Sequence, residues 1–406
     1  MPTNRKSLLA LIALAVSAFA IGTTEFISVG LLPLIADDLH ITVRTAGLTV
    51  TLYALGVTIG APVLTSLTAG VPRKTLLLWI MAVFIAGNSL AAISHSVTLL
   101  LTARVISAFA HGVFMSIGST IAASLVTENR RASAISIMFS GLTIATVTGV
   151  PLGTLLGQHF GWRSSFIAIA IIGLVAFVAN ALLITGELSR GTRTMMSDHA
   201  KLLSNSRLLL AFIITALGYG GTFVVFTYLS PLLHEVTGFG AQTIAAILFV
   251  YGIAIAVGNL IGGRAANRKP LKALLYMFAA QAVVLLLLAF AAPFKGPALL
   301  VIFLMGLLAF MNVPGLQTYV VVLAEQFAPR MKDVASALNI AAFNAGIALG
   351  AYLGGVVAEQ MGLVHTAWVG AVMVAAAAVL ARVSGVLEQR DQRAAADKRK
   401  HEQICA

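Results

Sequence analysis

Three ionisable side chains lie inside long apolar runs of the sequence, where charge is rare. Glu25 lies 17 residues into a run that begins near residue 8, Arg104 is the only basic residue inside such a run, and His111 follows Arg104 by seven residues. A charged side chain at the centre of a bilayer costs about 2.5–3.5 kcal/mol even on lenient scales, so such residues usually mark ion or proton pathways. We therefore consider these three residues as candidates for proton coupling.

Glu25 is the strongest of these candidates. The other 13 of the 14 acidic residues can be placed in loops, tails or helix ends. A carboxyl group in apolar surroundings can bind and release a proton near neutral pH. The alternative is a structural carboxyl group that hydrogen-bonds to a neighbouring hydroxyl such as Thr23 or Thr24.

Arg104 and His111 are two helical turns apart and so share nearly the same helix face. Arg104 should face a water-filled interior or a polar partner, because exposure to lipid is too costly. The alternative is a fixed ion pair or carbonyl anchor that only holds helices together. Imidazole titrates near neutral pH, which suits a proton relay or a hydrogen bond to a substrate. Equally, His111 could be a packing residue beside Ala110 and Gly112.

Uncharged polar and aromatic side chains are the candidates for substrate binding, since the second half of the chain has no acid or base in the middle of an apolar run. Amides facing a cavity can hydrogen-bond hydroxyl-rich or amphipathic substrates. They could instead join helices, a contribution of about 0.6 kcal/mol each. Asn339 and Asn344 are five residues apart, so at most one of them should be central. The candidates are Thr24, Phe26, Tyr53, Tyr228, Asn312, Gln317, Asn339 and Asn344.

The elements that carry these residues are apolar segments long enough to span a membrane. The chain has 406 residues, of which 59% are hydrophobic and 10% charged, whereas soluble domains have about 25% charged residues. A bilayer core takes about 20 apolar residues per helix, and barrel strands would be short and alternating. We therefore predict an all-α membrane protein with twelve transmembrane helices in two six-helix bundles. The segments fall at about 8–34, 46–68, 75–95, 98–126, 133–158, 163–186, 208–233, 241–262, 271–293, 296–323, 334–358 and 363–386.

The net charge of +12 is distributed by side of the membrane. With twelve spans and a cytoplasmic N-terminus, 22 of the 26 Lys and Arg residues are cytoplasmic, three are outside and Arg104 is within a span. This asymmetry follows the positive-inside rule. It indicates a multi-pass protein with both termini in the cytoplasm, in contact with the lipid bilayer, and it argues against a nucleic-acid partner.

The chain divides into two similar halves. The expected units are a first bundle at 1–186, a cytoplasmic linker at 187–207, a second bundle at 208–386 and a charged cytoplasmic tail at 387–406. Short basic loops follow the second segment of each half, with Arg73 and Lys74 in the first. Duplicated halves around a central pathway are the architecture expected of a secondary transporter.

Four stretches, in this order and spacing, resemble the major facilitator superfamily, and within it the twelve-helix drug:proton antiporters. The likeness covers nearly the whole chain and is closest to bacterial arabinose- and sugar-efflux permeases. The stretches are Thr23 to Phe26 with Gly30 to Pro33, Arg104 with Ala108 to His111, Gly149 to Gly153 with Gly161 to Arg163, and Asn339 to Gly346.

This resemblance implies roles for one loop and one motif. Arg73 and Lys74 would belong to a gating loop, and Gly149, Pro151 and Gly153 match the antiporter motif, which favours export. Proline bends a helix and glycines at i+4 spacing permit close packing, so ordinary small-residue packing is the alternative.

The sequence also departs from the family pattern at four positions. The gating loop normally carries a Gly and an Asp, and here these positions hold Thr65 and Ala69; the second copy has Asn267, and Ala108 replaces a Gly after Arg104. A gating network that depends on the aspartate is therefore in doubt.

We expect a proton-coupled exporter of sugars, sugar analogues or amphipathic drugs that works by alternating access in a bacterial inner membrane. The alternatives are a proton-coupled uptake symporter or facilitator and, distantly, a non-transporting sensor. No enzyme is expected, because clustered His, Asp and Glu residues are lacking. No Gly-x-x-x-x-Gly-Lys-Ser/Thr motif occurs, which leaves the proton gradient as the energy source. We expect no cofactor, no metal and a monomer; Cys405 is the only cysteine.

Overall fold

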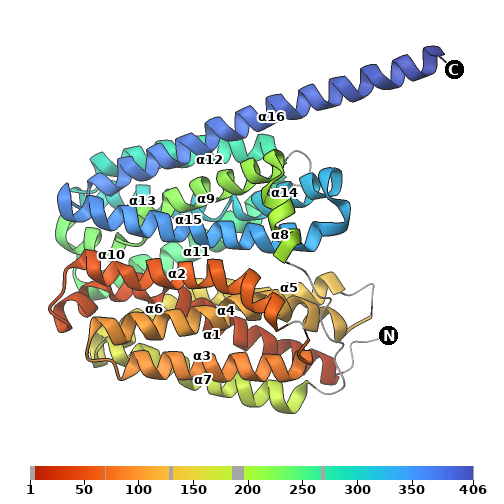
Figure 1. The fold of residues 1–406 in the computed structure, drawn as a ribbon. Coiled ribbons are helices and arrows are strands. Elements are labelled where there is room, and N and C mark those ends of the chain that lie inside the picture. Colours follow the sequence, from red (N-terminus) through yellow and green to blue (C-terminus); the bar gives the residue numbers. More distant parts are fainter. Residues whose placement is uncertain (1–4, 69, 128–130, 185–195, 267–269, 406) are drawn as a thin grey trace.

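The computed structural model describes residues 5–68, 70–127, 131–184, 196–266 and 270–405, and over these ranges every regular element is a helix (Figure 1). Within these described ranges, twelve helical spans are long and apolar enough to cross a membrane, which confirms the predicted fold class. The first group comprises α1 (Arg5–Asp38), α2 (Val43–Leu67), α3 (Arg73–Ala92), α4 (Val97–Ser124), α5 (Arg131–Ile144), η2 (Ala145–Gly149), α6 (Val150–Phe160) and α7 (Trp162–Leu183). After α8 (Met196–Leu203), the second group comprises α9 (Ser206–Phe226), α10 (Leu229–Pro231), η3 (Leu232–Val236), α11 (Ala241–Ala266), α12 (Pro270–Ala291), α13 (Lys295–Ala309), α14 (Val313–Phe327), η4 (Pro329–Met331), α15 (Lys332–Gln360) and α16 (His365–Cys405).

The two groups pack as two bundles that meet along a few helices (Figure 1). In the first bundle α1 packs against α5 and α7, and α2 packs against α4; in the second, α9 packs against α15 and α16. Between the bundles, α2 contacts α15, and α11 contacts η2 and α6. The segment predicted as a linker contains a short helix, α8.

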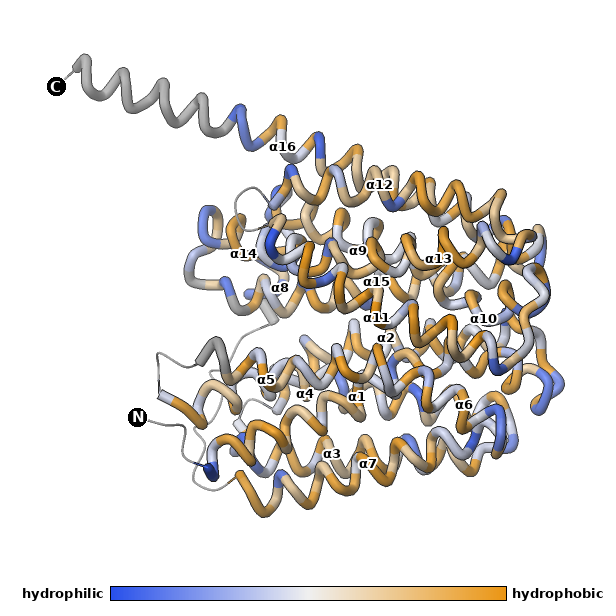
Figure 2. The backbone as a smooth tube through the Cα atoms, turned by 180° about the vertical axis from the view of Figure 1, so that it is seen from behind, coloured by the Kyte–Doolittle hydropathy of each residue, from blue (hydrophilic) through white to orange (hydrophobic). Residues whose placement is uncertain are grey.

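Large apolar side chains cover the flanks of both bundles. Trp79, Leu182 and Phe290 are 67%, 71% and 77% exposed, and hydropathy coloured along the chain is predominantly apolar in the helices, with hydrophilic residues at their ends (Figure 2). A water-facing surface of this kind would be unstable, so these side chains face lipid. The chain is a multi-pass membrane protein.

Both chain ends lie on one side of the molecule (Figure 1). We call this the terminal side and the other face the opposite side. Odd-numbered spans therefore run from the terminal to the opposite side, and even-numbered spans return.

Prolines interrupt three of the spans. Pro151 has no N–H to donate inside its span, and the preceding turn, η2, is a π-helix in which the Val150 N–H donates to the Ala145 carbonyl. A second π turn, η3, follows Pro231. The tenth span is broken between α13 and α14, where Pro314 lies in the first turn of α14.

Small residues at every fourth position let the fifth span lie directly against α1. A side chain added at Gly149 would meet Thr23, one at Gly153 would meet Ile27, and one at Gly157 would meet Leu31. Gly141 lies against the backbone oxygen of Ala15. The Gly149, Pro151 and Gly153 motif therefore fixes the middle of α1, the segment that carries Glu25.

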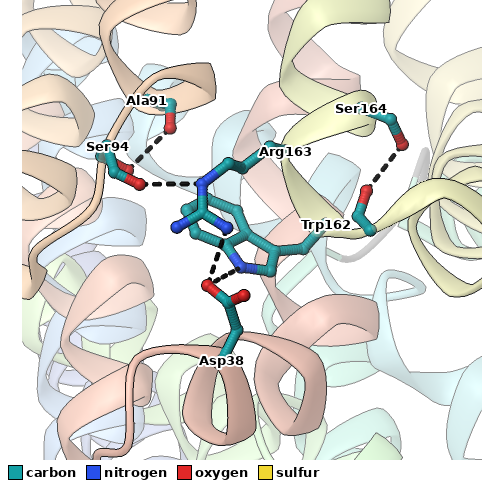
Figure 3. Close-up of polar contacts among 7 residues, drawn as sticks. Asp38, Ala91, Ser94, Trp162, Arg163 and Ser164 are labelled. Carbon is teal, nitrogen blue, oxygen red and sulfur yellow. Dashed lines mark hydrogen bonds and ion pairs between the residues drawn. The ribbon is translucent and has the colours of Figure 1, made fainter.

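A polar cluster ties three elements together on the opposite side (Figure 3). Asp38 at the end of α1 accepts hydrogen bonds from Trp162 Nε1 at 3.1 Å and from Arg163 at 2.7 Å. The Arg163 Nε donates to the Ser94 carbonyl at 2.9 Å and its guanidinium lies 4.3 Å from the Trp162 ring centre. Arg163 is thus a structural residue of the first bundle.

We predict that Gly141→Ala destabilises the first bundle. The added methyl group would strike the backbone of Ala15, which cannot move without displacing α1, and overpacking of this kind costs about 1–3 kcal/mol. Thermal unfolding in detergent should show a lower Tm than for wild type. Gly296→Ala is the matched control, because nothing lies within 4 Å of a side chain added there; equal Tm values for the two variants would contradict the close-packing assignment.

Candidate functional site

Arg104 anchors α4 to two neighbouring helices through their backbones. Its guanidinium donates to the carbonyl oxygens of Thr24 at 2.7 Å, Thr49 at 3.2 Å and Glu25 at 3.4 Å. The side chain is only 1% exposed. This is the carbonyl-anchor arrangement that the sequence left open for Arg104, and the residue holds α1 in place next to Glu25.

The carboxyl group of Glu25 has no such anchor. Its side chain is half-buried, and no described residue donates a hydrogen bond to it or forms an ion pair with it, although Arg104 lies within electrostatic range. The two hydroxyls proposed as structural partners bond elsewhere: Thr23 donates to the Phe19 carbonyl at 2.8 Å, and Thr24 to Asn88 Oδ1. The carboxyl group is therefore free to exchange a proton or contact a ligand.

Tyr53 and His111 extend the buried cluster around Arg104. The Arg104 guanidinium lies 4.1 Å from the Tyr53 ring centre, a cation–π distance. The Tyr53 hydroxyl and His111 Nδ1 are 3.1 Å apart, and His111 is 3% exposed. His111 thus has a fixed hydrogen-bond partner on α2, and Tyr53 is enclosed by helices rather than facing an open site.

Asn88 on α3 is a member of this cluster that sequence reasoning missed. It accepts from Thr24, and its Nδ2 donates to the Phe84 carbonyl at 2.9 Å and lies 3.4 Å from Ser107 Oγ. The available signal is a single amide within the apolar run at 75–95. Its role is to fix the Thr24 hydroxyl, so Thr24 has a structural partner.

Phe26, the residue after Glu25, reaches across to the second bundle. Its ring centre lies 6.1 Å from that of Phe223, 6.3 Å from Phe226 and 6.0 Å from Phe310. Tyr219 joins the same aromatic cluster through Phe223, Phe310 and Phe343 at 5.0–5.2 Å. Glu25 therefore lies where the bundles meet.

The amides of the second bundle divide into two kinds. Asn339 donates to Gln317 at 2.8 Å and accepts from Thr215 at 2.8 Å, while Gln317 donates to Ser336. Gln317 and Asn339 thus join α9, α14 and α15, the helix-joining role that the sequence left open. In contrast, both amide atoms of buried Asn312 and the Oδ1 of Asn344 lack partners.

Contacts between the bundles close the opposite side. Arg44 on α2 pairs with Glu359 on α15, and Gln158 Nε2 donates to the Ala241 carbonyl at 2.9 Å. Tyr228 lies against Gly47 and Gly355 and donates to the Ala351 carbonyl at 3.0 Å. Tyr228 is thus part of this closure and does not lie beside Glu25.

The bundles also meet toward the middle and the terminal side, where the Thr58 hydroxyl on α2 lies 3.4 Å from the Ala341 carbonyl oxygen on α15. The fifth span touches α11 through η2 and α6, its portions nearer the opposite side. Arg73 and Lys74 begin α3 on the terminal side and are half-buried; their neighbour Ala69 and the equivalent Asn267 lie outside the described residues. No described group of three or more His, Cys, Asp or Glu residues could hold a metal ion.

Comparison with known proteins identifies the family. Residues 14–326 match the model of the Major Facilitator Superfamily. The chain belongs to that superfamily. An uncharacterized transporter of the superfamily from Bacillus subtilis, YtbD, is 67% identical, with 97% of this chain and 99% of the relative covered.

Two further comparisons place this superfamily member among known sequences and folds. The inner membrane transport protein YdhP of Escherichia coli K12 is 36% identical over 92% of this chain and 95% of its own. The crystal structure of a bacterial homologue of the human lysosomal transporter Spinster, inward-facing and unoccupied, superimposes with a TM-score of 0.66 at 16% identity over 94% of this chain and 96% of its own. This last likeness supports the fold alone.

We predict that Arg104→Lys lowers thermal stability although it keeps the positive charge. A single ammonium group cannot reach three carbonyls on two helices, and each lost hydrogen bond to a charged group costs about 1.5–3 kcal/mol. The Tm in detergent should fall relative to Arg264→Lys, a control at an exposed basic residue. An unchanged Tm in Arg104→Lys would mean that charge alone, and not carbonyl binding, is what α4 requires.

We also predict that the Arg44–Glu359 pair biases the protein toward closure of the opposite side. Arg44→Glu converts an attraction of about 0.2–1 kcal/mol between partly exposed charges into a repulsion. Spin labels at His95 and Gly296, on the opposite side of the two bundles, should show a larger share of long distances in a Cys405→Ser background. The double variant Arg44→Glu/Glu359→Arg should restore the wild-type distribution; failure to do so would assign the effect to something other than this pair.

Proposed function

We propose that this superfamily member is a proton-coupled secondary transporter of the drug:proton antiporter type, which exports small molecules across a bacterial inner membrane. The terminal side is cytoplasmic in this proposal, because the excess of Lys and Arg lies there. The inner-membrane location agrees with the printed name of the YdhP relative.

The observation that carries the proposal is the position of Glu25. The carboxyl group lies deep in a span, has no hydrogen-bond donor among the described residues, and is followed by Phe26, which contacts the second bundle. A proton on Glu25 changes the charge at the bundle interface. Loss and gain of that proton can therefore favour different arrangements of the two bundles, as coupled transport by alternating access requires.

The aromatic and amide groups near this interface favour a neutral or amphipathic substrate. Phe26 of the first bundle and Tyr219 and Phe310 of the second provide apolar faces. The unpartnered atoms of Asn312 and Asn344 provide hydrogen-bonding capacity in the second bundle. Such a set suits sugars, sugar analogues and amphipathic drugs. Export is preferred over uptake because of the Gly149, Pro151 and Gly153 motif, and a proton-coupled symporter is the alternative.

The test is a proteoliposome assay with a pH-sensitive dye inside and a panel of arabinose, a thiogalactoside, chloramphenicol and a lipophilic cation outside. Wild type should move protons when a substrate is added, with a direction opposite to substrate movement. Glu25→Gln should abolish the substrate-dependent proton signal, because an amide cannot carry a proton. Asp37→Asn is the matched control, since Asp37 is an exposed acid at the end of the same helix.

Each result separates the alternatives. Proton movement in the same direction as substrate would replace the antiporter by the symporter. Substrate-dependent proton movement that is unchanged in Glu25→Gln would leave Glu25 without the coupling role.

A further inference from the structure

A cavity of about 840 Å³ lies on the flank of the second bundle near the terminal side, away from Glu25 and the aromatic cluster. Its walls come from the start of α12, the middle of α14 and the stretch 381–389 of α16. The proposed transport path does not use this cavity, and its lining combines two basic side chains with an apolar wall.

The first feature is a pair of exposed basic side chains at the membrane boundary. Lys272 is the third residue of α12, Arg382 lies on α16, and both line the cavity. Neither forms a hydrogen bond or ion pair with any of the described residues, although the Lys272 ammonium lies 6.0 Å from the Tyr276 ring centre. Two unpaired cations beside one cavity can bind an anionic group together.

The second feature is an apolar wall that continues from these cations into the membrane. Leu271, Leu275, Val322 and Val386 line it, and Val322 and Val386 are 43% and 46% exposed. Leu275 lies five residues into α12, which is about 7 Å along the helix axis. Gly385 widens the cavity by the absence of a side chain, and the Tyr319 and Ser384 hydroxyls satisfy each other at 2.6 Å beneath it.

We propose that this cavity binds one anionic phospholipid, with its phosphate on Lys272 and Arg382 and an acyl chain along the apolar wall. A soluble anion would use the cations but not the wall, and a zwitterionic lipid would use the wall but gain less from the cations. Basic pockets between helices at the cytoplasmic side are suited to anionic headgroups, because the cytoplasmic leaflet contains the anionic lipids that make its surface negative.

An acidic residue in the cavity provides a second, opposite test of the proposal. Glu388 lines the same cavity, and its charge opposes an incoming phosphate. Its removal should therefore strengthen binding, whereas removal of the cations should weaken it. Opposite responses from neighbouring residues cannot come from general destabilisation.

The experiment is native mass spectrometry of the whole protein in detergent, titrated with dioleoylphosphatidylglycerol. Each basic residue near an anionic surface contributes roughly a factor of five in affinity, so Lys272→Ala/Arg382→Ala should weaken the tightest lipid by about 25-fold. Glu388→Gln should tighten it. The control Arg5→Ala/Arg264→Ala removes two exposed charges from the same side and should leave that affinity unchanged.

Two further titrations distinguish the sources of the phosphate. Dioleoylphosphatidylcholine should bind more weakly than phosphatidylglycerol in wild type, and glycerol 3-phosphate should not compete at equal concentration. Equal binding of the two lipids would overturn the proposal in favour of a non-selective apolar surface, and effective competition by glycerol 3-phosphate would overturn it in favour of a soluble-anion site. Because Glu25 is not involved, these outcomes are independent of the proposed transport function.

Discussion

A guanidinium group buried among apolar helices must satisfy its donors within the protein, and Arg104 does so on backbone carbonyls of α1 and α2. This requirement ties three helices together at the depth of Glu25, and the Tyr53 ring over the same cation adds a further contact. Because Arg104 binds carbonyl oxygens and not the carboxylate, Glu25 keeps its titratable group available. One residue thus ties the helices of the first bundle together and places a positive charge within electrostatic range of Glu25.

Close packing of α1 against the fifth span is the second condition for this arrangement. Without a hydrophobic driving force between helices in lipid, association relies on close contact and hydrogen bonds, and Gly149 and Gly153 bring the backbones together beside Thr23 and Ile27. Pro151 and the π turn before it shift the helix register, so that these glycines face α1. The motif that resembles an antiporter signature therefore has a direct structural consequence for the Glu25 segment, whatever its bearing on direction of transport.

The sequence predicted the twelve spans because lipid imposes a length and an apolar composition on each span, and both can be counted. Glu25 and Arg104 were identifiable because charge within such a span is costly. Partner atoms were not predictable, since they depend on helix rotation and crossing: Asn88 and Thr24, or Gln317 and Asn339, are far apart in sequence. For the same reason Tyr228 was grouped with central residues, whereas it lies near the Arg44–Glu359 pair on the opposite side.

The ion pair between the bundles and the Arg104 anchor inside the first bundle differ in how easily they can break. The pair of Arg44 and Glu359 is partly exposed to solvent, so it can break at small free-energy cost. The Arg104 anchor lies inside the first bundle, where water cannot replace the carbonyl partners of the guanidinium group. Motion between the bundles therefore need not disturb the first bundle's interior. Phe26 links the first bundle to the second, because it follows Glu25 on α1 and contacts Phe223 and Phe310 of the second bundle. In the proposed transport cycle, a change of charge on Glu25 would act next to this aromatic contact and would there bias the relative position of the two bundles.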